Sequence, residues 1–115
     1  MVVEDNVINQ KIFSKILQSV GVRADFAGDG KSGIEKVGKG KYDIIFMDIQ
    51  MPIMTGIDAA RKIREMGLKI PIIAVTAHAM TEDRDTALAC GMDDYMTKPV
   101  NKDKVVTILK KYHKF

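Results

Sequence analysis

The chain has 115 residues, which is enough for one compact domain and too few for two. Apolar residues make up 46% and charged residues 29%, so the chain can build a core and stay in solution. No apolar run approaches the roughly 20 residues of a membrane helix, and the opening residues lead straight into acids, unlike a signal peptide. The net charge of +3 comes from scattered lysines, which argues against a nucleic-acid surface.

The single cysteine, Cys90, cannot form an internal disulfide, and no cysteine and histidine residues have the spacing of metal ligands. Because Cys90 precedes Gly91 at the end of a helical pattern, we expect a small buried side chain. One free cysteine agrees with a reducing, cytoplasmic setting.

The first half of the sequence alternates short strands with helices. A strand over residues 1–3 leads to a helix that Asn6 caps and that ends before Gly21. Residues 22–27 alternate in polarity as an edge strand should, and residues 31–39 predict a weaker helix. Helical spacing gives the first helix a wide apolar face, made of Val7, Ile8, Ile12, Phe13, Ile16, Leu17 and Val20.

Two nearly continuous apolar runs mark the middle of the predicted sheet. Residues 43–48 and 72–76 are typical of strands that are buried on both faces, as in a parallel sheet. Between them, residues 52–56 predict a loop and residues 57–66 a helix. A fourth helix is expected from its cap Thr81 to Gly91, a short strand over 94–97, and a fifth helix after its cap Asn101.

Five strand–helix repeats predict a three-layer α/β sandwich, in which helices cover both faces of a five-stranded parallel sheet. Five strands favour the flavodoxin-like order 2-1-3-4-5. We therefore expect residues 1–115 to form one domain.

Polar residues stand at the strand ends that share one rim of this sheet. Glu4 and Asp5 follow the first strand, Asp48 ends the third, Thr76 ends the fourth, and Lys98 follows the fifth. Ligands of α/β proteins bind at this rim. Three carboxylates in one crevice raise each other's pKa and need a counter-charge, which a lysine and Mg²⁺ can supply. Such a carboxylate can attack a phosphoryl group.

Each of these residues also has an ordinary structural interpretation. The two acids after the first strand could be a solvated helix entry, Asp48 could begin a turn, and Thr76 could be a strand-end hydroxyl. Lys98 and the following Pro99 could form a simple turn. Their convergence at one rim favours the chemical interpretation.

With these residues in view, the chain resembles the receiver domain of two-component response regulators. Sequences around Asp48 and over residues 77–80 and 91–95 are most similar to receivers of hybrid sensor histidine kinases. The matching segments cover the chain from end to end and read Val2-Val3-Glu4-Asp5-Asn6, Met47-Asp48-Ile49-Gln50-Met51-Pro52, Met54-Thr55-Gly56, Ala74-Val75-Thr76-Ala77, Ala89-Cys90-Gly91-Met92-Asp93-Asp94-Tyr95 and Lys98-Pro99.

The resemblance implies a phosphoacceptor and a metal site. Asp48 would take phosphate from a phosphohistidine on a histidine kinase or a histidine phosphotransfer domain. Glu4, Asp5, Asp48 and the backbone carbonyl of Gln50 would hold Mg²⁺. The domain would promote its own phosphorylation and dephosphorylation rather than act as a stand-alone enzyme, and His78, like Gln50, occupies a position that tunes the lifetime of the phosphate.

The resemblance also implies a switch. Thr76 would move towards the phosphoryl group, Tyr95 would turn inward behind it, and Lys98 would contact the phosphoryl oxygens. The bond from Lys98 to Pro99 would be cis. The first helix would be a docking face for a phosphotransfer helix, and the fourth helix, fifth strand and fifth helix would form the face that changes on activation.

Other function classes fit less well. A flavodoxin-type protein would not place two acids where a phosphate must sit, a phosphatase would want an acid where Gln50 stands, and a P-loop enzyme needs a glycine-rich run that is absent. The serious alternative is a receiver-like interaction module that acts without phosphorylation. Its mark would be the loss of an acid, Thr76 or Lys98, and all of them are present.

Overall fold

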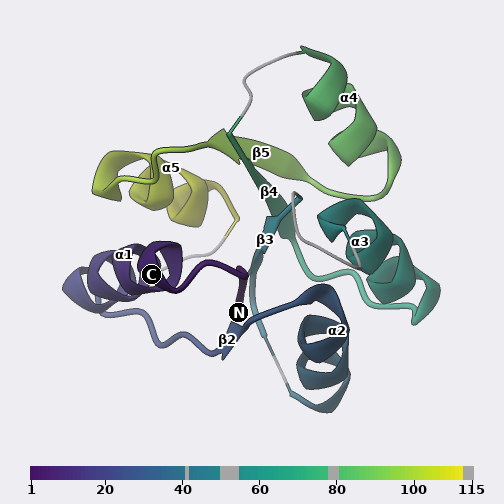
Figure 1. The fold of residues 1–115 in the computed structure, drawn as a ribbon, viewed down its shortest axis with the longest axis horizontal. Coiled ribbons are helices and arrows are strands. Elements are labelled where there is room, and N and C mark those ends of the chain that lie inside the picture. The colour runs from purple at the N-terminus through teal and green to yellow at the C-terminus, as the bar shows by residue number, and fades with distance from the viewer. Residues whose placement is uncertain (41, 50–54, 78–80, 113–115) are drawn as a thin grey trace.

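The computed structural model describes residues 1–40, 42–49, 55–77 and 81–112, without the side chains of residues 81–84. Five parallel strands form one sheet in the order β2-β1-β3-β4-β5, which confirms the predicted flavodoxin-like topology (Figure 1). The strands are β1 (Val2–Val3), β2 (Phe26–Ala27), β3 (Ile45–Asp48), β4 (Ile72–Thr76) and β5 (Asp94–Thr97). The helices are α1 (Val7–Ser19), α2 (Gly30–Lys39), α3 (Gly56–Glu65), α4 (Thr81–Ala89) and α5 (Lys102–Tyr112).

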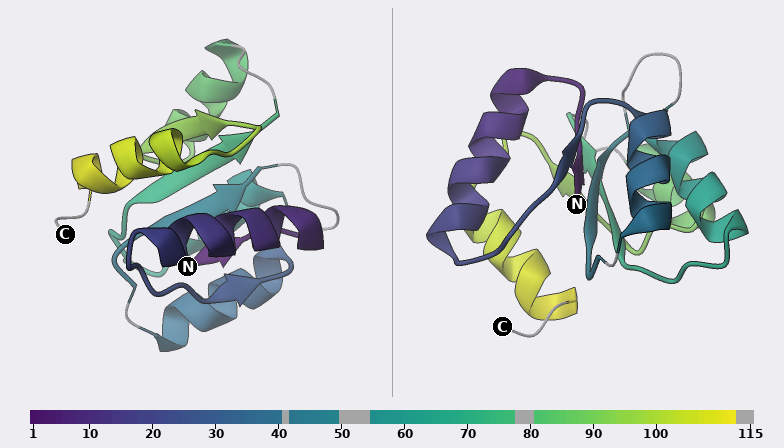
Figure 2. Two further views of the ribbon diagram at one scale, coloured as in Figure 1. Left: turned by 90° about the vertical axis from the view of Figure 1, so that its left-hand side faces the viewer. Right: turned by 90° about the horizontal axis from the view of Figure 1, so that it is seen from below.

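The helices lie in two layers, with α1 and α5 on one face of the sheet and α2, α3 and α4 on the other (Figure 2). Each face has its own apolar core. In the β3 segment, Ile45 and Met47 join the core beneath α2, α3 and α4, whereas Ile44 and Phe46 join the core beneath α1 and α5. The prediction that this strand is buried on both faces is therefore confirmed.

The second strand is shorter than the predicted residues 22–27. Its paired residues are only Phe26 and Ala27, because β1 offers only Val2 and Val3 as partners. The start of the predicted strand instead belongs to the turn after α1, where the Val22 amide donates to the Leu17 carbonyl at 2.9 Å. The predicted edge position of this strand is confirmed.

The apolar face predicted for α1 is only partly buried. Phe13 and Leu17 enter the core, as expected from their spacing. Val7 and Ile8, at the start of the helix, are 61% and 70% exposed, and Ile12 is also exposed. Periodicity gave the position of the apolar stripe correctly but not the part of it that another element covers.

The predicted helix starts hold to within a residue or two. The Asn6 side chain caps α1 by accepting from the Ile8 and Asn9 amides, and Asn101 accepts from the Lys104 amide at the start of α5. Thr81, predicted as a cap, is instead the first residue of α4. The predicted burial of Cys90 is confirmed.

A glycine sits where α3 begins against the end of β3. The Gly56 amide donates to the Ile49 carbonyl at 3.3 Å. A Cβ atom on Gly56 would touch the Asp48 carbonyl oxygen and lie 2.7 Å from the Ile49 Cα. This close approach of two backbones fixes the position of the segment that carries Asp48.

One arginine joins two loops near the other ends of the strands. The Arg64 guanidinium donates to the carbonyl oxygens of Leu68, Ile70 and Gly91 at 2.8–2.9 Å. It also forms an ion pair with Asp93 at 2.8 Å, and the same carboxylate oxygen of Asp93 accepts from the backbone amide of residue 72. These contacts tie the turns after α3 and α4 to the start of β4.

Across the described residues, every helix is too short or too polar to span a bilayer.

Candidate functional site

The strand register brings the predicted site residues to one rim. Val3 pairs with Met47, so the residues that follow them, Glu4 and Asp48, lie side by side. Asp48 itself pairs with Val75, which precedes Thr76. Thr76 pairs with Thr97, and the Lys98 amide then donates to the Thr76 carbonyl at 2.7 Å.

Three acids converge at this rim. Each of Glu4, Asp5 and Asp48 offers a carboxylate oxygen, and these oxygens all lie within 4.8 Å of one another. Glu4 is 1% exposed and Asp48 is 2% exposed, whereas Asp5 is open to solvent. Two buried carboxylates beside an exposed third create a negative potential that attracts cations.

The lysine predicted for this site is in place. Lys98 Nζ lies 3.3 Å from Asp48 Oδ2 and 3.5 Å from Glu4 Oε2. One ammonium therefore serves two buried carboxylates, which leaves a net negative charge between them. The peptide bond between Lys98 and Pro99 is cis, as the resemblance implied.

The start of α1 orients Glu4. Oε1 of Glu4 accepts from the Asn6 amide at 3.2 Å and from the Asn9 side chain at 3.4 Å. The Gln10 side chain donates to the Glu4 carbonyl at 2.6 Å. Within the described structure, Oε2 of Glu4 is a buried oxygen with no hydrogen-bond partner. The glutamate is thus held by one oxygen and presents the other to the acid cluster.

The electrostatics of Glu4 reflect this position. Burial and, after it, the adjacent Asp48 carboxylate raise the pKa of Glu4 from 4.5 to about 7, against the opposing effects of Lys98 and the Asn6 amide. A raised carboxyl pKa means that ionising Glu4 costs folding stability as the pH rises from about 4.5 towards 7. A cation at the rim would remove this cost.

The donor set suits a hard divalent cation. Mg²⁺ prefers oxygen ligands and is commonly held by one or two carboxylates together with water and phosphate oxygens. The acid cluster provides carboxylate oxygens, and Oε2 of Glu4, which accepts no hydrogen bond in the described structure and has the Lys98 ammonium 3.5 Å away, can serve as a ligand atom. These residues therefore fit a magnesium site, although the predicted fourth ligand, Gln50, lies outside the described residues, as does His78.

Thr76 and Tyr95 share the face of the sheet that α3 and α4 cover. Thr76 is buried. Tyr95 pairs with Ala74, two residues before the pairing of Thr76 with Thr97, and it packs half-buried against the core on that face. The register thus places the predicted switch aromatic one strand away from the threonine and on the same side.

Three polar residues support the site without having been predicted for it. Asn9 and Gln10 hold Glu4, as described above. Lys104, on α5, donates from Nζ to the Thr97 carbonyl, the Thr97 hydroxyl and the Pro99 carbonyl. The sequence signal for Asn9 and Gln10 was that both carry amide side chains three and four residues after the helix cap Asn6, close to Glu4.

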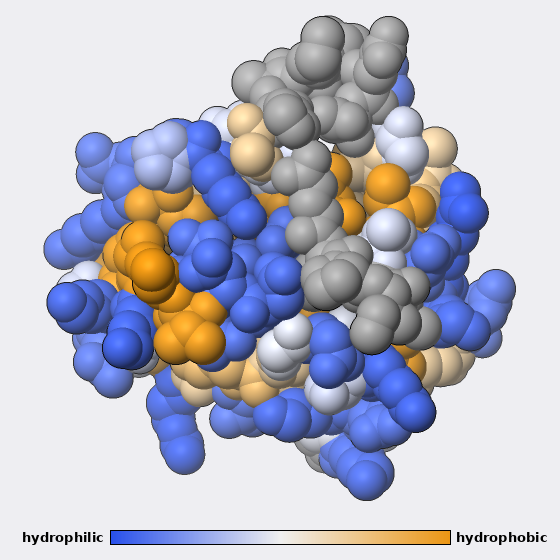
Figure 3. All heavy atoms as spheres, viewed as in Figure 1, coloured by the Kyte–Doolittle hydropathy of each residue, from blue (hydrophilic) through white to orange (hydrophobic). Residues whose placement is uncertain are grey.

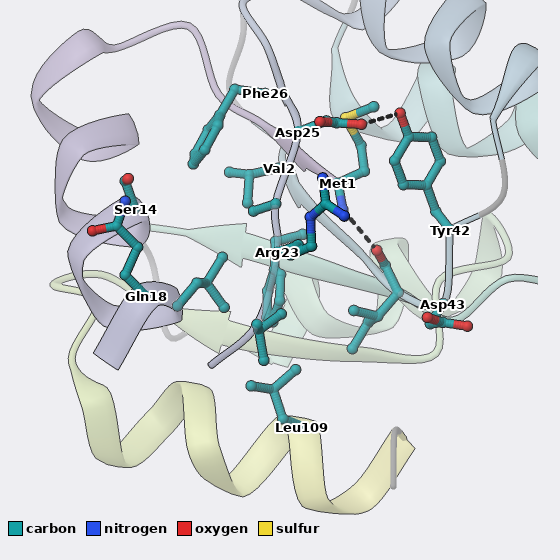
Figure 4. A pocket seen from close by; sticks show the side chains of 15 residues that line it. Met1, Val2, Ser14, Gln18, Arg23, Asp25, Phe26, Tyr42, Asp43 and Leu109 are labelled. Atoms are coloured by element: carbon teal, nitrogen blue, oxygen red, sulfur yellow. Dashed lines mark hydrogen bonds between the residues drawn. The ribbon is translucent and has the colours of Figure 1, made fainter. Parts of the chain in front are cut away.

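A separate cavity of about 580 Å³ lies near the opposite ends of β1 and β3 (Figure 4). Its lining mixes apolar side chains such as Val2 and Leu109 with charged ones such as Arg23 and Asp43. It contains none of the acids of the rim, and the Tyr42 hydroxyl donates to Asp25 at its edge at 2.7 Å. The acid cluster, not this cavity, carries the reactive groups.

An exposed apolar patch lies beside the rim. Val7, Ile8 and Ile12 all project from the first half of α1, which begins three residues after Glu4. Figure 3 shows hydrophobic side chains gathered over α1 next to the hydrophilic centre of the same face.

Comparisons with known proteins agree on one family. The family model of the response regulator receiver domain matches residues 1–110. Hybrid signal transduction histidine kinase I of Dictyostelium discoideum is 46% identical over 110 residues, which cover 88% of this chain but only 6% of that kinase.

Two solved structures are similar over most of their length. A receiver domain of a sensor histidine kinase from Pseudomonas aeruginosa, with a magnesium ion in its active-site cleft, matches with a TM-score of 0.88 and 38% identity, over 96% of this chain and 93% of that one. A Saccharomyces cerevisiae receiver domain, solved in complex with a histidine phosphotransfer protein, matches with a TM-score of 0.90 and 34% identity, over 96% of this chain and 85% of the matched one.

Proposed function

This chain belongs to the response regulator receiver domain family of two-component signalling, and we propose that Asp48 is its phosphoacceptor. One observation carries the assignment: Asp48 is a buried carboxylate at the end of a central strand, with the Lys98 ammonium 3.3 Å away and two further acids beside it. A structural carboxylate in that position would not need a second buried acid next to it.

The proposed reaction is a phosphoryl transfer from a phosphohistidine. A carboxylate oxygen of Asp48 attacks phosphorus, the P–N bond breaks, and the imidazole leaves with the bonding electron pair and takes up a proton. The product is an aspartyl-phosphate. Lys98 stays within reach of the phosphoryl oxygens and neutralises their charge, which is the main contribution that a protein makes to this reaction.

Glu4, Asp5 and Asp48, with the carbonyl of Gln50, are the proposed magnesium ligands. A magnesium ion held by these residues would neutralise the negative charge of the carboxylates and of the incoming phosphoryl group. The chain contributes to this site by fixing Glu4 through Oε1 and leaving Oε2 directed at the cluster.

Phosphorylation is proposed to act through Thr76 and Tyr95. The Thr76 hydroxyl would move to a phosphoryl oxygen, and Tyr95 would turn inward into the space that Thr76 leaves. Their shared face of the sheet supports the coupling. New charge at Asp48 would then bias a two-state equilibrium that partners read on α4, β5 and α5.

The proposed phosphodonor is a histidine kinase or a histidine phosphotransfer domain. The exposed apolar patch of Val7, Ile8 and Ile12 beside the rim suits a partner helix. The yeast relative in complex with a phosphotransfer protein supports this class of partner. We further propose a cytoplasmic domain, without direct contact to nucleic acid or membrane, that forms part of a hybrid histidine kinase.

Acetyl phosphate with Mg²⁺, followed by intact-mass measurement, tests the assignment. We expect the wild type to gain one phosphoryl group and Asp48→Asn to gain none. Asp43→Asn is the matched control, because Asp43 is an exposed acid just before the same strand and should leave the mass gain intact. No gain in the wild type, or an equal gain in Asp48→Asn, would favour the interaction module that works without phosphorylation.

A further inference from the structure

Lys104 lies where α5 meets the turn that carries Lys98. Its Nζ donates to the Thr97 carbonyl at 3.0 Å, to the Thr97 hydroxyl at 3.3 Å and to the Pro99 carbonyl at 3.1 Å. The Lys104 amide in turn donates to the Asn101 side chain at 2.9 Å, which fixes the first turn of the helix. One ammonium therefore binds the backbone on both sides of Lys98.

Lys98 depends on such support, because its own side chain is long and rotatable. Its ammonium must stay near Asp48 and Glu4 at 3.3 and 3.5 Å. On its amino-terminal side, the Lys98 amide is anchored to the Thr76 carbonyl at 2.7 Å. Lys104 binds the carbonyl groups of the residues before and after Lys98, which are Thr97 and Pro99.

These bonds are stronger than ordinary turn contacts. Each is donated by a charged group, and hydrogen bonds of that kind are about twice as strong as those between neutral groups. The three acceptors are uncharged oxygens, two of them backbone carbonyls of Thr97 and Pro99 and the third the Thr97 hydroxyl, so in these contacts the ammonium binds the turn and not an acid.

We propose that Lys104 is a positioning residue for phosphoryl transfer, which acts by holding the turn that aims Lys98 at Asp48. The inference rests on the proposed phosphoacceptor role of Asp48. Losing the three bonds would let the turn move, and a displacement of about 1 Å at a catalytic group can slow a reaction by up to about 100-fold. We expect a decrease of about ten-fold, because the anchor at Thr76 remains.

The test compares rates of phosphorylation by acetyl phosphate in Lys104→Met, Lys104→Arg and the control Lys102→Met. Lys102 is an exposed residue in the same first turn of α5. Its variant removes an equal charge without changing a residue that binds the Thr97–Pro99 segment. We expect a rate about ten-fold lower for Lys104→Met, at least partial rescue by arginine, and less than a two-fold change for the control.

A second background separates positioning from simple support of the fold. In Lys98→Met, the Lys104→Met change should have no further effect on the rate, because it acts only through Lys98. The Lys98 amide resonance in an NMR spectrum should also shift in Lys104→Met and return in Lys104→Arg, which gives a measurement independent of activity.

Equal slowing in both backgrounds, or a Lys104→Met rate within two-fold of the control, would overturn the positioning role while leaving Asp48 as the acceptor. If the wild type gains no phosphoryl group, or Asp48→Asn gains one equally, both the acceptor assignment and this inference fall.

Discussion

Replacing Gly56 with alanine should destabilise the domain strongly. The added Cβ would lie 2.7 Å from the Ile49 Cα and 2.8 Å from the Asp48 carbonyl carbon, and it would also touch the Asp48 carbonyl oxygen. Carbon atoms at optimal separation are about 3.5–4.0 Å apart, so α3 and the end of β3 must separate by roughly 1 Å. Movement of a side chain cannot relieve these contacts, because the three nearest atoms all belong to the backbone.

The cost follows from the cost of overpacking. Extra methyl groups in packed sites cost about 1–3 kcal/mol, and a contact with backbone belongs at the upper end. With a urea dependence of about 1.5 kcal/mol per molar, a loss of about 3 kcal/mol lowers the unfolding midpoint by about 2 M. Far-ultraviolet circular dichroism can follow unfolding, since the chain has no tryptophan.

Gly38→Ala is the matched control for the same chemical change. Its Cβ would meet only the terminal methyl of Met66, at 3.0 Å, and that side chain can move. Alanine also favours helix over glycine by about 0.5–1 kcal/mol, so this variant should unfold at equal or higher urea. If Gly56→Ala unfolds at the same urea concentration as the wild type, the close backbone approach does not constrain the site as described.

Three further variants test other parts of the structure. Asn6→Ala removes the cap of α1 and should lower the free energy of unfolding by about 1 kcal/mol in a urea titration. Glu4→Gln should raise the free energy of unfolding at neutral pH without Mg²⁺ by about 1 kcal/mol, because a buried carboxylate oxygen that accepts no hydrogen bond beside Asp48 is replaced by a donor. Calorimetry should show weaker Mg²⁺ binding, and an unchanged affinity would contradict the ligand role. Burial raises the pKa of Asp94, but hydrogen bonds from the Lys111 ammonium and other donors outweigh burial and hold the pKa below its usual range. The stability that Asp94 adds is therefore present above about pH 4 and is lost as the pH falls through the lowered pKa. Asp94→Asn should therefore show a smaller loss of stability on acidification than the wild type, and an identical pH profile would count against the ion pair.

Most of the site could be predicted because, in a parallel sheet, the order of the strands determines which carboxyl-terminal strand ends are neighbours. Once β3 and β4 are identified from their apolar runs, the parallel topology places Asp48 and Thr76 at the same rim as Glu4 and Lys98. Residue type then suggests the chemistry. Neither step requires knowledge of side-chain conformation.

What could not be predicted depends on contacts between distant residues. Hydrophobic spacing places Val7 and Ile8 on the stripe of α1 but contains no information on whether anything covers them. The alternation over residues 22–27 resembles a strand, but pairing depends on how much of β1 is available. Lys104 looks like any surface lysine of an amphipathic helix, because its partners are backbone oxygens that the sequence does not specify.

The contacts of Arg64 have a consequence for protein engineering. Surface loops usually accept inserted segments, provided that their backbone groups are not already committed. In the turns after α3 and α4, the carbonyl groups of Leu68, Ile70 and Gly91 already accept hydrogen bonds from the Arg64 guanidinium. A longer loop there would separate the guanidinium from these acceptors. A Cβ atom on Gly28 would meet no other atom within 4 Å, so the turn there suits an inserted epitope or reporter better.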